Sequence, residues 1–251
     1  MTAAAAVGVD AGSTTCKAVA IDRAGRILAR RVEAASPRVE EQAARLVAEL
    51  RAEARGDPAV GATGYGRKRI QAGRALTEIT CHARGAFALA GRPGVLVDVG
   101  GQDTKVIKVG PGGEVLDFAM NDKCAAGTGR FLEVILARLH VPLAEVAACA
   151  AGAARAVRVS STCTVFAETE VISLVANGEP LEDIVKGLHV SLASRVAALA
   201  RGLGGGEVLM SGGVALNAAM VAALSEALGA RVAVLPDPQL AGALGAALSV
   251  L

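Results

Sequence analysis

The stretches Asp10-Ala-Gly-Ser-Thr-Thr-Cys-Lys17 and Asp98-Val-Gly-Gly-Gln-Asp-Thr-Lys105 decide the fold of this chain. Both read Asp-x-Gly, four further residues and Lys, and they begin 88 residues apart. Each follows a short apolar run, at residues 7–9 and 95–97, and each precedes a second β-type run and a glycine-containing turn. A unit of strand, glycine-rich hairpin and strand that occurs twice predicts two similar lobes.

The rest of each half has the apolar spacing of helices, with a few further strands between them. We expect helices at residues 38–54, 78–90, 128–139, 143–151, 165–176, 181–203, 214–228 and 240–251, and strands at residues 60–63, 207–210 and 232–235. Strands and helices in both halves predict an α/β fold. The first lobe should span residues 1–92 and be completed by a C-terminal helix within residues 239–251, and the second should span residues 93–238.

Composition excludes several classes of protein. The 251 residues are 53% hydrophobic, which excludes a disordered chain because there is ample apolar surface to bury. A net charge of +2 gives no electrostatic basis for binding nucleic acid. We see no basic leader and no span suited to a bilayer, and we expect a cytoplasmic protein without a membrane partner. Five irregularly spaced cysteines favour reduced thiols over a disulfide framework, and no metal site within a single chain is visible.

The two glycine-rich turns have the chemistry of phosphate-binding loops. Backbone N–H groups can converge on an anion where no Cβ obstructs them. A third glycine site, Ser211-Gly-Gly213, lies between a strand and a helix and suits a ribose or a nucleobase. Asp10 and Asp98 end equivalent strands and could hold Mg²⁺ through water. The candidate contacts to phosphate and nucleoside are Gly12, Ser13, Thr14, Thr15, Lys17, Gly100, Gly101, Gly212, Gly213 and Asn217.

These three sites resemble the phosphate-1, phosphate-2 and adenosine motifs of the actin, Hsp70 and sugar-kinase superfamily. Further stretches narrow the resemblance to the ATP-dependent activators of 2-hydroxyacyl-CoA dehydratases and the ATPase subunits of benzoyl-CoA reductase. The matching stretches are Gly8-Val-Asp-Ala-Gly-Ser-Thr15, Ala62-Thr-Gly-Tyr-Gly-Arg67, Glu78-Ile-Thr-Cys-His-Ala83, Asp98-Val-Gly-Gly-Gln-Asp103, Met120-Asn-Asp-Lys-Cys-Ala-Ala-Gly-Thr-Gly-Arg-Phe-Leu-Glu133, Ser160-Ser-Thr-Cys-Thr-Val-Phe-Ala-Glu168 and Gly242-Ala-Leu-Gly-Ala-Ala-Leu248. They cover essentially the whole chain.

The resemblance implies a fold and a nucleotide chemistry. It implies two ribonuclease H-like lobes of this superfamily's type, with a nucleotide cleft between them, and Mg²⁺-dependent hydrolysis of ATP to ADP. The implied catalytic residues are Asp10, Asp98, Gln102 and Asp103, and either Gln102 or Asp103 would orient the attacking water. The resemblance adds Gly127, Gly129, Gln239 and Gly242 to the residues that contact ATP.

Cys124 and Cys163 each lie just before a predicted helix. A helix N-terminus offers N–H groups and partial positive charge, which suit a thiolate and an anionic iron–sulfur cluster. A [4Fe-4S] cluster normally takes four cysteines, and a two-fold dimer of this chain would supply them. The resemblance implies this arrangement, with both cysteines as ligands. We interpret Cys16, Cys81 and Cys149 as structural residues.

The implied function is an ATPase coupled to electron transfer. By analogy with the family, the homodimer would take electrons from ferredoxin or flavodoxin and drive them into a 2-hydroxyacyl-CoA dehydratase or an aryl-CoA reductase component. Residues 121–130 would link the second phosphate turn to Cys124. Glu168 and Glu170 could tune the cluster, or could simply favour the start of a helix.

Two other functions are compatible with the same nucleotide motifs. The first is a small-molecule kinase of the superfamily, acting on an amino sugar or an acyl acid, without a cluster. The second is an actin-like or chaperone-like assembly ATPase. The chain is short for a kinase with its own substrate pocket, and it lacks an obvious peptide-binding domain.

Overall fold

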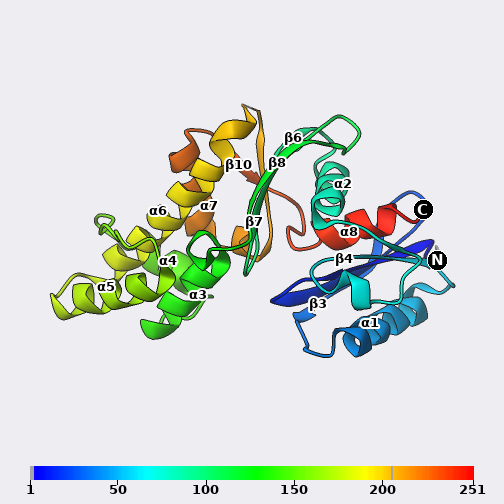
Figure 1. Ribbon diagram of the computed structural model, residues 1–251, viewed down its shortest axis with the longest axis horizontal. Helices are drawn as coiled ribbons and strands as arrows, with labels where there is room; N and C mark the ends of the chain where they lie inside the picture. The colour runs from blue at the N-terminus through cyan, green and yellow to red at the C-terminus, as the bar shows by residue number, and fades with distance from the viewer. Residues whose placement is uncertain (1–2, 205) are drawn as a thin grey trace. The chain divides into compact units, whose positions relative to one another are not determined.

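The computed structural model describes residues 3–204 and 206–251, and the chain divides into two compact units. Unit 1 comprises Met1–Leu96, Ile107–Phe118 and Leu235–Leu251, and unit 2 comprises Val97–Val106 and Ala119–Val234. Strands and helices occur in both units, so the α/β class is confirmed (Figure 1). The lobe boundaries expected after residues 92 and 238 stay a prediction.

The strands are β1 (Ala6–Ala11), β2 (Thr15–Ile21), β3 (Ile27–Ala34), β4 (Ala59–Thr63), β5 (Arg74–Ala75), β6 (Gly94–Val99), β7 (Thr104–Val109), β8 (Val115–Asn121), β9 (Val208–Ser211) and β10 (Val232–Val234). The α-helices are α1 (Val39–Ala54), α2 (Glu78–Ala90), α3 (Gly129–Arg138), α4 (Val146–Ala151), α5 (Thr164–Ala176), α6 (Leu181–Ala200), α7 (Ala218–Leu228) and α8 (Ala241–Leu248). Short 3₁₀ helices are η1 (Arg67–Arg69), η2 (Ala125–Gly127), η3 (Arg201–Leu203) and η4 (Gly213–Leu216).

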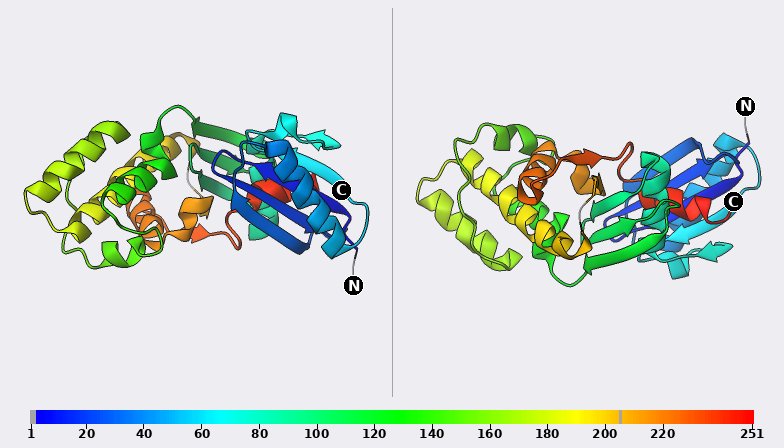
Figure 2. Two further views of the ribbon diagram at one scale, coloured as in Figure 1. Left: turned by 90° about the horizontal axis from the view of Figure 1, so that it is seen from below. Right: turned by 90° about the horizontal axis from the view of Figure 1, so that it is seen from above.

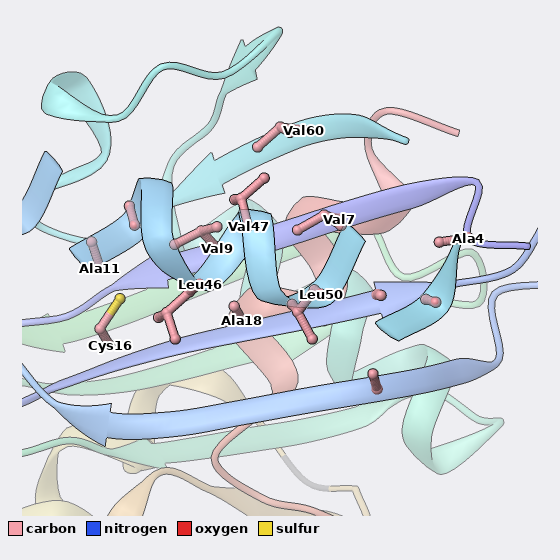
Figure 3. Packing of buried hydrophobic residues seen from close by; sticks show 14 residues of the cluster. Ala4, Val7, Val9, Ala11, Cys16, Ala18, Leu46, Val47, Leu50 and Val60 are labelled. Atoms are coloured by element: carbon pink, nitrogen blue, oxygen red, sulfur yellow. The ribbon is translucent and has the colours of Figure 1, made fainter. Parts of the chain in front are cut away.

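The sheet of unit 1 has the strand order β3-β2-β1-β4-β5. Strands β1, β2 and β3 form an antiparallel meander, and β4 joins the other side of β1 in parallel after the crossover through α1. Helix α1 covers one face of this sheet, where Leu46, Val47 and Leu50 pack against small apolar residues of β1 and β2 (Figure 3). The apolar spacing expected for this helix is therefore the spacing of its buried side.

The C-terminal helix α8 belongs to unit 1. Its residues Ala243, Leu244 and Ala247, with the preceding Leu240, pack against three residues of the first two strands, Ala6, Val19 and Ile21. The packing is close enough to involve backbone atoms, because a Cβ added to Gly245 would lie 1.8 Å from the carbonyl oxygen of Cys81 in α2. Glycine at this position lets α8 rest directly on α2.

The second sheet has the strand order β10-β9-β6-β7-β8, with β9 and β10 parallel. Helices α3 to α7 belong to unit 2, and α6 contacts α3, α4, α5 and α7 (Figure 2). The largest buried side chains here include Phe131, Ile135, Leu188 and Leu192. Among the described residues, no helix combines the length and the apolar character needed to span a membrane.

Candidate functional site

Asp10 lies near the end of β1, and its carboxylate is 3% exposed. The hairpin register pairs it with Lys17, and Lys17 Nζ lies 3.3 Å from Asp10 Oδ2. A Cβ added to Gly242 would lie 2.8 Å from Asp10 Oδ2 and 2.9 Å from His82 Nε2. Glycine at position 242 therefore keeps the backbone of α8 close to this carboxylate, and His82 lies beside it.

The first glycine-rich turn joins β1 to β2. Ser13 and Thr14 are exposed at its tip. A Cβ added to Gly12 would lie 3.0 Å from the carbonyl oxygen of Thr15 and 3.1 Å from Lys17 Nζ, so the turn requires a small residue there. The exposed hydroxyl groups of Ser13 and Thr14 lie at the tip of this hairpin, whereas the Lys17 ammonium group faces Asp10. Phosphate binding by this turn stays a prediction.

Asp98 occupies the equivalent place in unit 2 and is 2% exposed. Ser211 Oγ donates a 2.6 Å hydrogen bond to Asp98 Oδ1. Lys105 Nζ lies 3.6 Å from Asp98 Oδ2 and 2.5 Å from Asp103 Oδ2. In both copies of the motif, the lysine thus turns back toward the aspartate that opens it.

Two residues of the second turn differ in their surroundings. Asp103 is held by Lys105, and its carbonyl oxygen accepts a 2.9 Å hydrogen bond from the N–H of Gly100. Gln102 is exposed. Gln239, in unit 1, is half-buried just before α8. The roles of these residues in positioning water or nucleotide stay predictions.

The start of α3 is fastened to the second turn. The N–H groups of Gly129 and Arg130 donate 2.9 Å hydrogen bonds to the carbonyl oxygens of Gly100 and Gly101, respectively. Thr104 Oγ1 donates a 2.7 Å hydrogen bond to the carbonyl oxygen of Gly127. The backbone of this turn is therefore hydrogen-bonded to the segment at residues 127–130.

The segment after the third glycine site differs from the helix that was expected there. Gly212 has a φ of +88°, and an added Cβ would lie 2.3 Å from the carbonyl oxygen of Val99, so only glycine fits. Residues Gly213–Leu216 form η4, and α7 begins at Ala218. The prediction that the helix begins at residue 214, with Asn217 one turn inside it, is wrong.

Asn217 is instead the N-cap of α7, and its Oδ1 accepts hydrogen bonds from the N–H groups of Ala219 and Met220. Its Nδ2 lies 2.8 Å from Nε2 of His189, whose Nδ1 lies 2.7 Å from the carbonyl oxygen of Val185. Burial lowers the pKa of His189, while these two hydrogen bonds oppose the shift. A neutral ring that donates from Nδ1 and accepts at Nε2 satisfies both contacts. The proposed contact of Asn217 with adenosine stays a prediction.

Cys124 and Cys163 are both exposed, and each caps the N-terminus of a helix. Cys124 precedes η2, and the Asn121 side chain binds both its N–H and its carbonyl oxygen, at 3.1 and 2.7 Å. Cys163 precedes α5, where its carbonyl oxygen accepts a 2.8 Å hydrogen bond from Ala167. Cys16 and Cys81 are buried. Cys163 thus lies directly before α5, as expected, whereas Cys124 lies before the short 3₁₀ helix η2, and α3 begins only at Gly129.

The loops that contain these two cysteines are joined by Arg195 of α6, a residue that sequence reasoning missed. Arg195 Nη2 donates a 2.8 Å hydrogen bond to the carbonyl oxygen of Ser161, and Nη1 a 3.4 Å one to that of Ala126. Burial lowers the pKa of Arg195, and the nearby Cys124 acts in the opposite direction. In the sequence, Arg195 is one polar position in a long helix, and no local pattern marks it.

Glu170 of α5 holds the loop before Cys163. Its carboxylate accepts hydrogen bonds from the N–H and hydroxyl of Ser160, at 2.8 and 2.7 Å, and from the N–H of Ser161, at 2.8 Å. Partial burial acts to raise the pKa of Glu170, but these hydrogen bonds prevail and lower it to about 2. Glu168 faces Arg138 at 3.8 Å instead.

The sequence pattern of the BadF/BadG/BcrA/BcrD ATPase family matches residues 7–250. The chain belongs to this family. Over 249 residues it is 42% identical to the (R)-2-hydroxyglutaryl-CoA dehydratase activating ATPase of Acidaminococcus fermentans, covering 96% of this chain and 95% of that protein. The resemblance read from the sequence motifs is confirmed.

Solved structures agree with this assignment. The activator of the 2-hydroxyisocaproyl-CoA dehydratase from Clostridium difficile, solved with bound ADPNP, is 40% identical, with a TM-score of 0.91, and the match covers 98% of this chain and 93% of that one. A sugar kinase, the ROK family glucokinase from Streptomyces griseus, has a TM-score of 0.59 at 17% identity, with 98% of each chain covered. That second likeness shows the fold alone, which is the expected fold of the superfamily. Membership of this ATPase family supports ATP hydrolysis by this chain.

Proposed function

We propose that this chain is an ATP-hydrolysing activator that drives low-potential electrons into a 2-hydroxyacyl-CoA dehydratase or a benzoyl-CoA reductase-type partner. One observation is central to the proposal. Two exposed cysteines cap helices within one unit, and the segment after the first of them is hydrogen-bonded to the second glycine-rich turn. A plain sugar kinase would have no use for that arrangement.

The nucleotide chemistry is assigned to the two motifs. Asp10 and Asp98 would hold Mg²⁺ through water, and the turns around Gly12 and Gly100 would bind phosphate oxygens through backbone N–H groups. Gln102 or Asp103 would orient the attacking water. Water breaks the terminal phosphoanhydride bond, and ATP becomes ADP and phosphate. Such phosphoryl transfer depends on positioning and charge stabilisation, which rigid turns supply.

The donor set of Cys124 and Cys163 fits half of a [4Fe-4S] cluster. Both thiols are exposed, Cys163 at the N-terminus of α5, where an anionic group is favoured, and Cys124 before the short helix η2. Within residues 3–204 and 206–251, no group of three or more His, Cys, Asp or Glu side chains is arranged to hold a metal ion. We therefore assign the other two ligands to a second copy of the chain, in a homodimer. When bound, the cluster would supply a one-electron carrier.

ATP hydrolysis and electron transfer would be coupled through the hydrogen bonds that connect Gly100 and Gly101 to the segment after Cys124. These two carbonyl oxygens accept hydrogen bonds from Gly129 and Arg130, only a few residues after Cys124. A shift of the turn when the terminal phosphate leaves would move the start of α3 and η2 with it. In each cycle, the dimer takes one electron from reduced ferredoxin or flavodoxin and passes that electron to the partner enzyme. The cytoplasm, which keeps thiols reduced, suits its free cysteines.

The test compares the wild-type protein with Gly101→Val, both purified under argon. The reduced wild-type protein should give an iron–sulfur EPR signal that changes on addition of ATP, together with ATP hydrolysis. Gly101→Val should keep the signal and lose both the hydrolysis and the ATP-induced change, because a branched side chain would stand among the backbone N–H groups proposed to bind phosphate. Gly202→Val serves as the control, since a Cβ at that position meets nothing within 4 Å. An ATP-induced change that survives in Gly101→Val would refute the coupling.

A further inference from the structure

Arg195 lies on α6, and its guanidinium group is packed between the two cysteine loops. Besides its hydrogen bonds to Ser161 and Ala126, it lies over the ring of Phe131, with Cζ 4.9 Å from the ring centroid. Phe131 is fully buried in α3. A cation over an aromatic face, with two carbonyl oxygens in reach, has a defined orientation and not merely a favourable charge.

Each of the two carbonyl oxygens that Arg195 binds belongs to a residue two positions from one of the cysteines. Ala126 is two residues after Cys124, and Ser161 is two residues before Cys163. The backbone of Ser161 is held by two side chains, because its N–H donates to Glu170 and its carbonyl oxygen accepts from Arg195. One side chain thus fixes the spacing between two loops that lie far apart in the sequence.

The inference rests on the proposed cluster. We propose that Arg195 is a positioning residue for the iron–sulfur site: its guanidinium holds the Cys124 and Cys163 loops in register and places a fixed positive charge beside them. The first role requires the two-pronged guanidinium, whereas the second requires only a cation. A lysine would keep the charge but could not bind both carbonyl oxygens in the same plane.

A positive charge next to an electron carrier stabilises its reduced, more negative state. Loss of that charge should therefore shift the midpoint potential of the cluster to a more negative value. Loss of the bridge between the loops should instead weaken the retention of iron, because groups that orient metal ligands typically change metal retention by about 10-fold or more. The two roles can thus be measured separately.

The experiment compares Arg195→Met, Arg195→Lys and the control Arg201→Met after identical anaerobic reconstitution with iron and sulfide. Arg201 is exposed, at the end of the same helix. The rate of iron loss to a chelator should rise about 10-fold in both Arg195 variants and stay unchanged in Arg201→Met. The midpoint potential should become more negative in Arg195→Met and stay near the wild-type value in Arg195→Lys.

Thermal unfolding of the metal-free proteins, followed by circular dichroism, checks folding, and Arg195→Lys keeps a long cationic side chain at this position if the methionine variant is unstable. Iron retention and potential equal to wild type in both variants would overturn the proposal. Equal potentials in the lysine and methionine variants would overturn the charge role. A wild-type protein that takes up no cluster would instead refute the proposed function itself, so the two failures are distinguishable.

Discussion

At the scale of single residues, burial separates the cysteines into chemically different groups. Burial, and then the negative charge of Asp10, raise the pKa of Cys16 to about 11. Burial also raises the pKa of Cys81. Because the thiolate is the nucleophile and the metal ligand, these two thiols are inert at neutral pH. Cys124 and Cys163 are exposed.

This difference predicts the labelling pattern of the metal-free folded protein. Iodoacetamide should modify Cys124 and Cys163 first, and should leave Cys16 and Cys81 unmodified over the same time, as peptide mass spectrometry would show. In denaturant, all five cysteines should react. Modification of Cys16 in the folded protein as fast as that of Cys124 would contradict the burial described above.

Glu170 predicts a pH dependence of stability. Hydrogen bonds from Ser160 and Ser161 lower its pKa from 4.5 to about 2 on folding. A carboxyl group whose pKa falls on folding stabilises the protein at pH values above its pKa in the unfolded chain. That contribution is lost as the pH falls toward its pKa in the folded protein. The difference in unfolding free energy between wild type and Glu170→Gln should therefore shrink between pH 4.5 and pH 2.

Chemical denaturation of the metal-free proteins at several pH values measures this difference. Glu168→Gln is the matched control, because its carboxylate lies 3.8 Å from Arg138 and holds no backbone N–H group of the loop. A difference between Glu170→Gln and wild type that stays constant over this pH range would contradict the assignment of the hydrogen bonds.

At the scale of elements, small residues set how closely α8 packs in unit 1. Cβ atoms added to Gly8 and Gly85 would lie 1.9 and 1.8 Å from carbonyl oxygens of Ala243 and Ala241. Contacts this short leave no room for a side chain at Gly8 or at Gly85. Because the core of this unit contains many alanines and the chain has few aromatic residues, its backbones are closely spaced.

Gly245→Ala tests that packing. The new Cβ would meet the carbonyl oxygen of Cys81 at 1.8 Å. Overpacking of this kind typically costs about 1–3 kcal/mol, so the free energy of unfolding should fall by at least that amount. Gly202→Ala, where the added Cβ meets nothing within 4 Å, should change it little. Equal stability of the two variants in urea unfolding would show that α8 packs differently.

Element prediction from the sequence worked where local pattern decides the structure. Helix α2 has the predicted bounds, and α5 and α6 begin within one residue of the expected positions. The predicted start of α7 is wrong, because the Asn217 side chain caps the helix at residue 217. The apolar residues before it belong to the 3₁₀ helix η4. Arg195 was missed because its partners lie 34 and 69 residues away.

At the scale of the whole molecule, each unit contains one copy of the phosphate motif. Lys17 pairs with Asp10 in unit 1, and Lys105 pairs with Asp98 in unit 2. Within the part of the chain that the structure describes, the second copy is followed by a segment that contains Cys124 and is hydrogen-bonded back to its turn. In the proposed function, the two copies of the motif would bind the nucleotide, and the segment that follows the second copy would link it to electron transfer.

The central claim is that two cysteines per chain, and four per dimer, hold one cluster. The decisive measurement is the iron and sulfide content of the protein purified under argon, together with its molar mass in solution. We predict about four irons and four sulfides per two chains, and loss of the cluster in both Cys124→Ala and Cys163→Ala. Cys149→Ala, the control, should keep it. An iron-free monomer under these conditions, or a full cluster in either of the first two variants, would contradict the account.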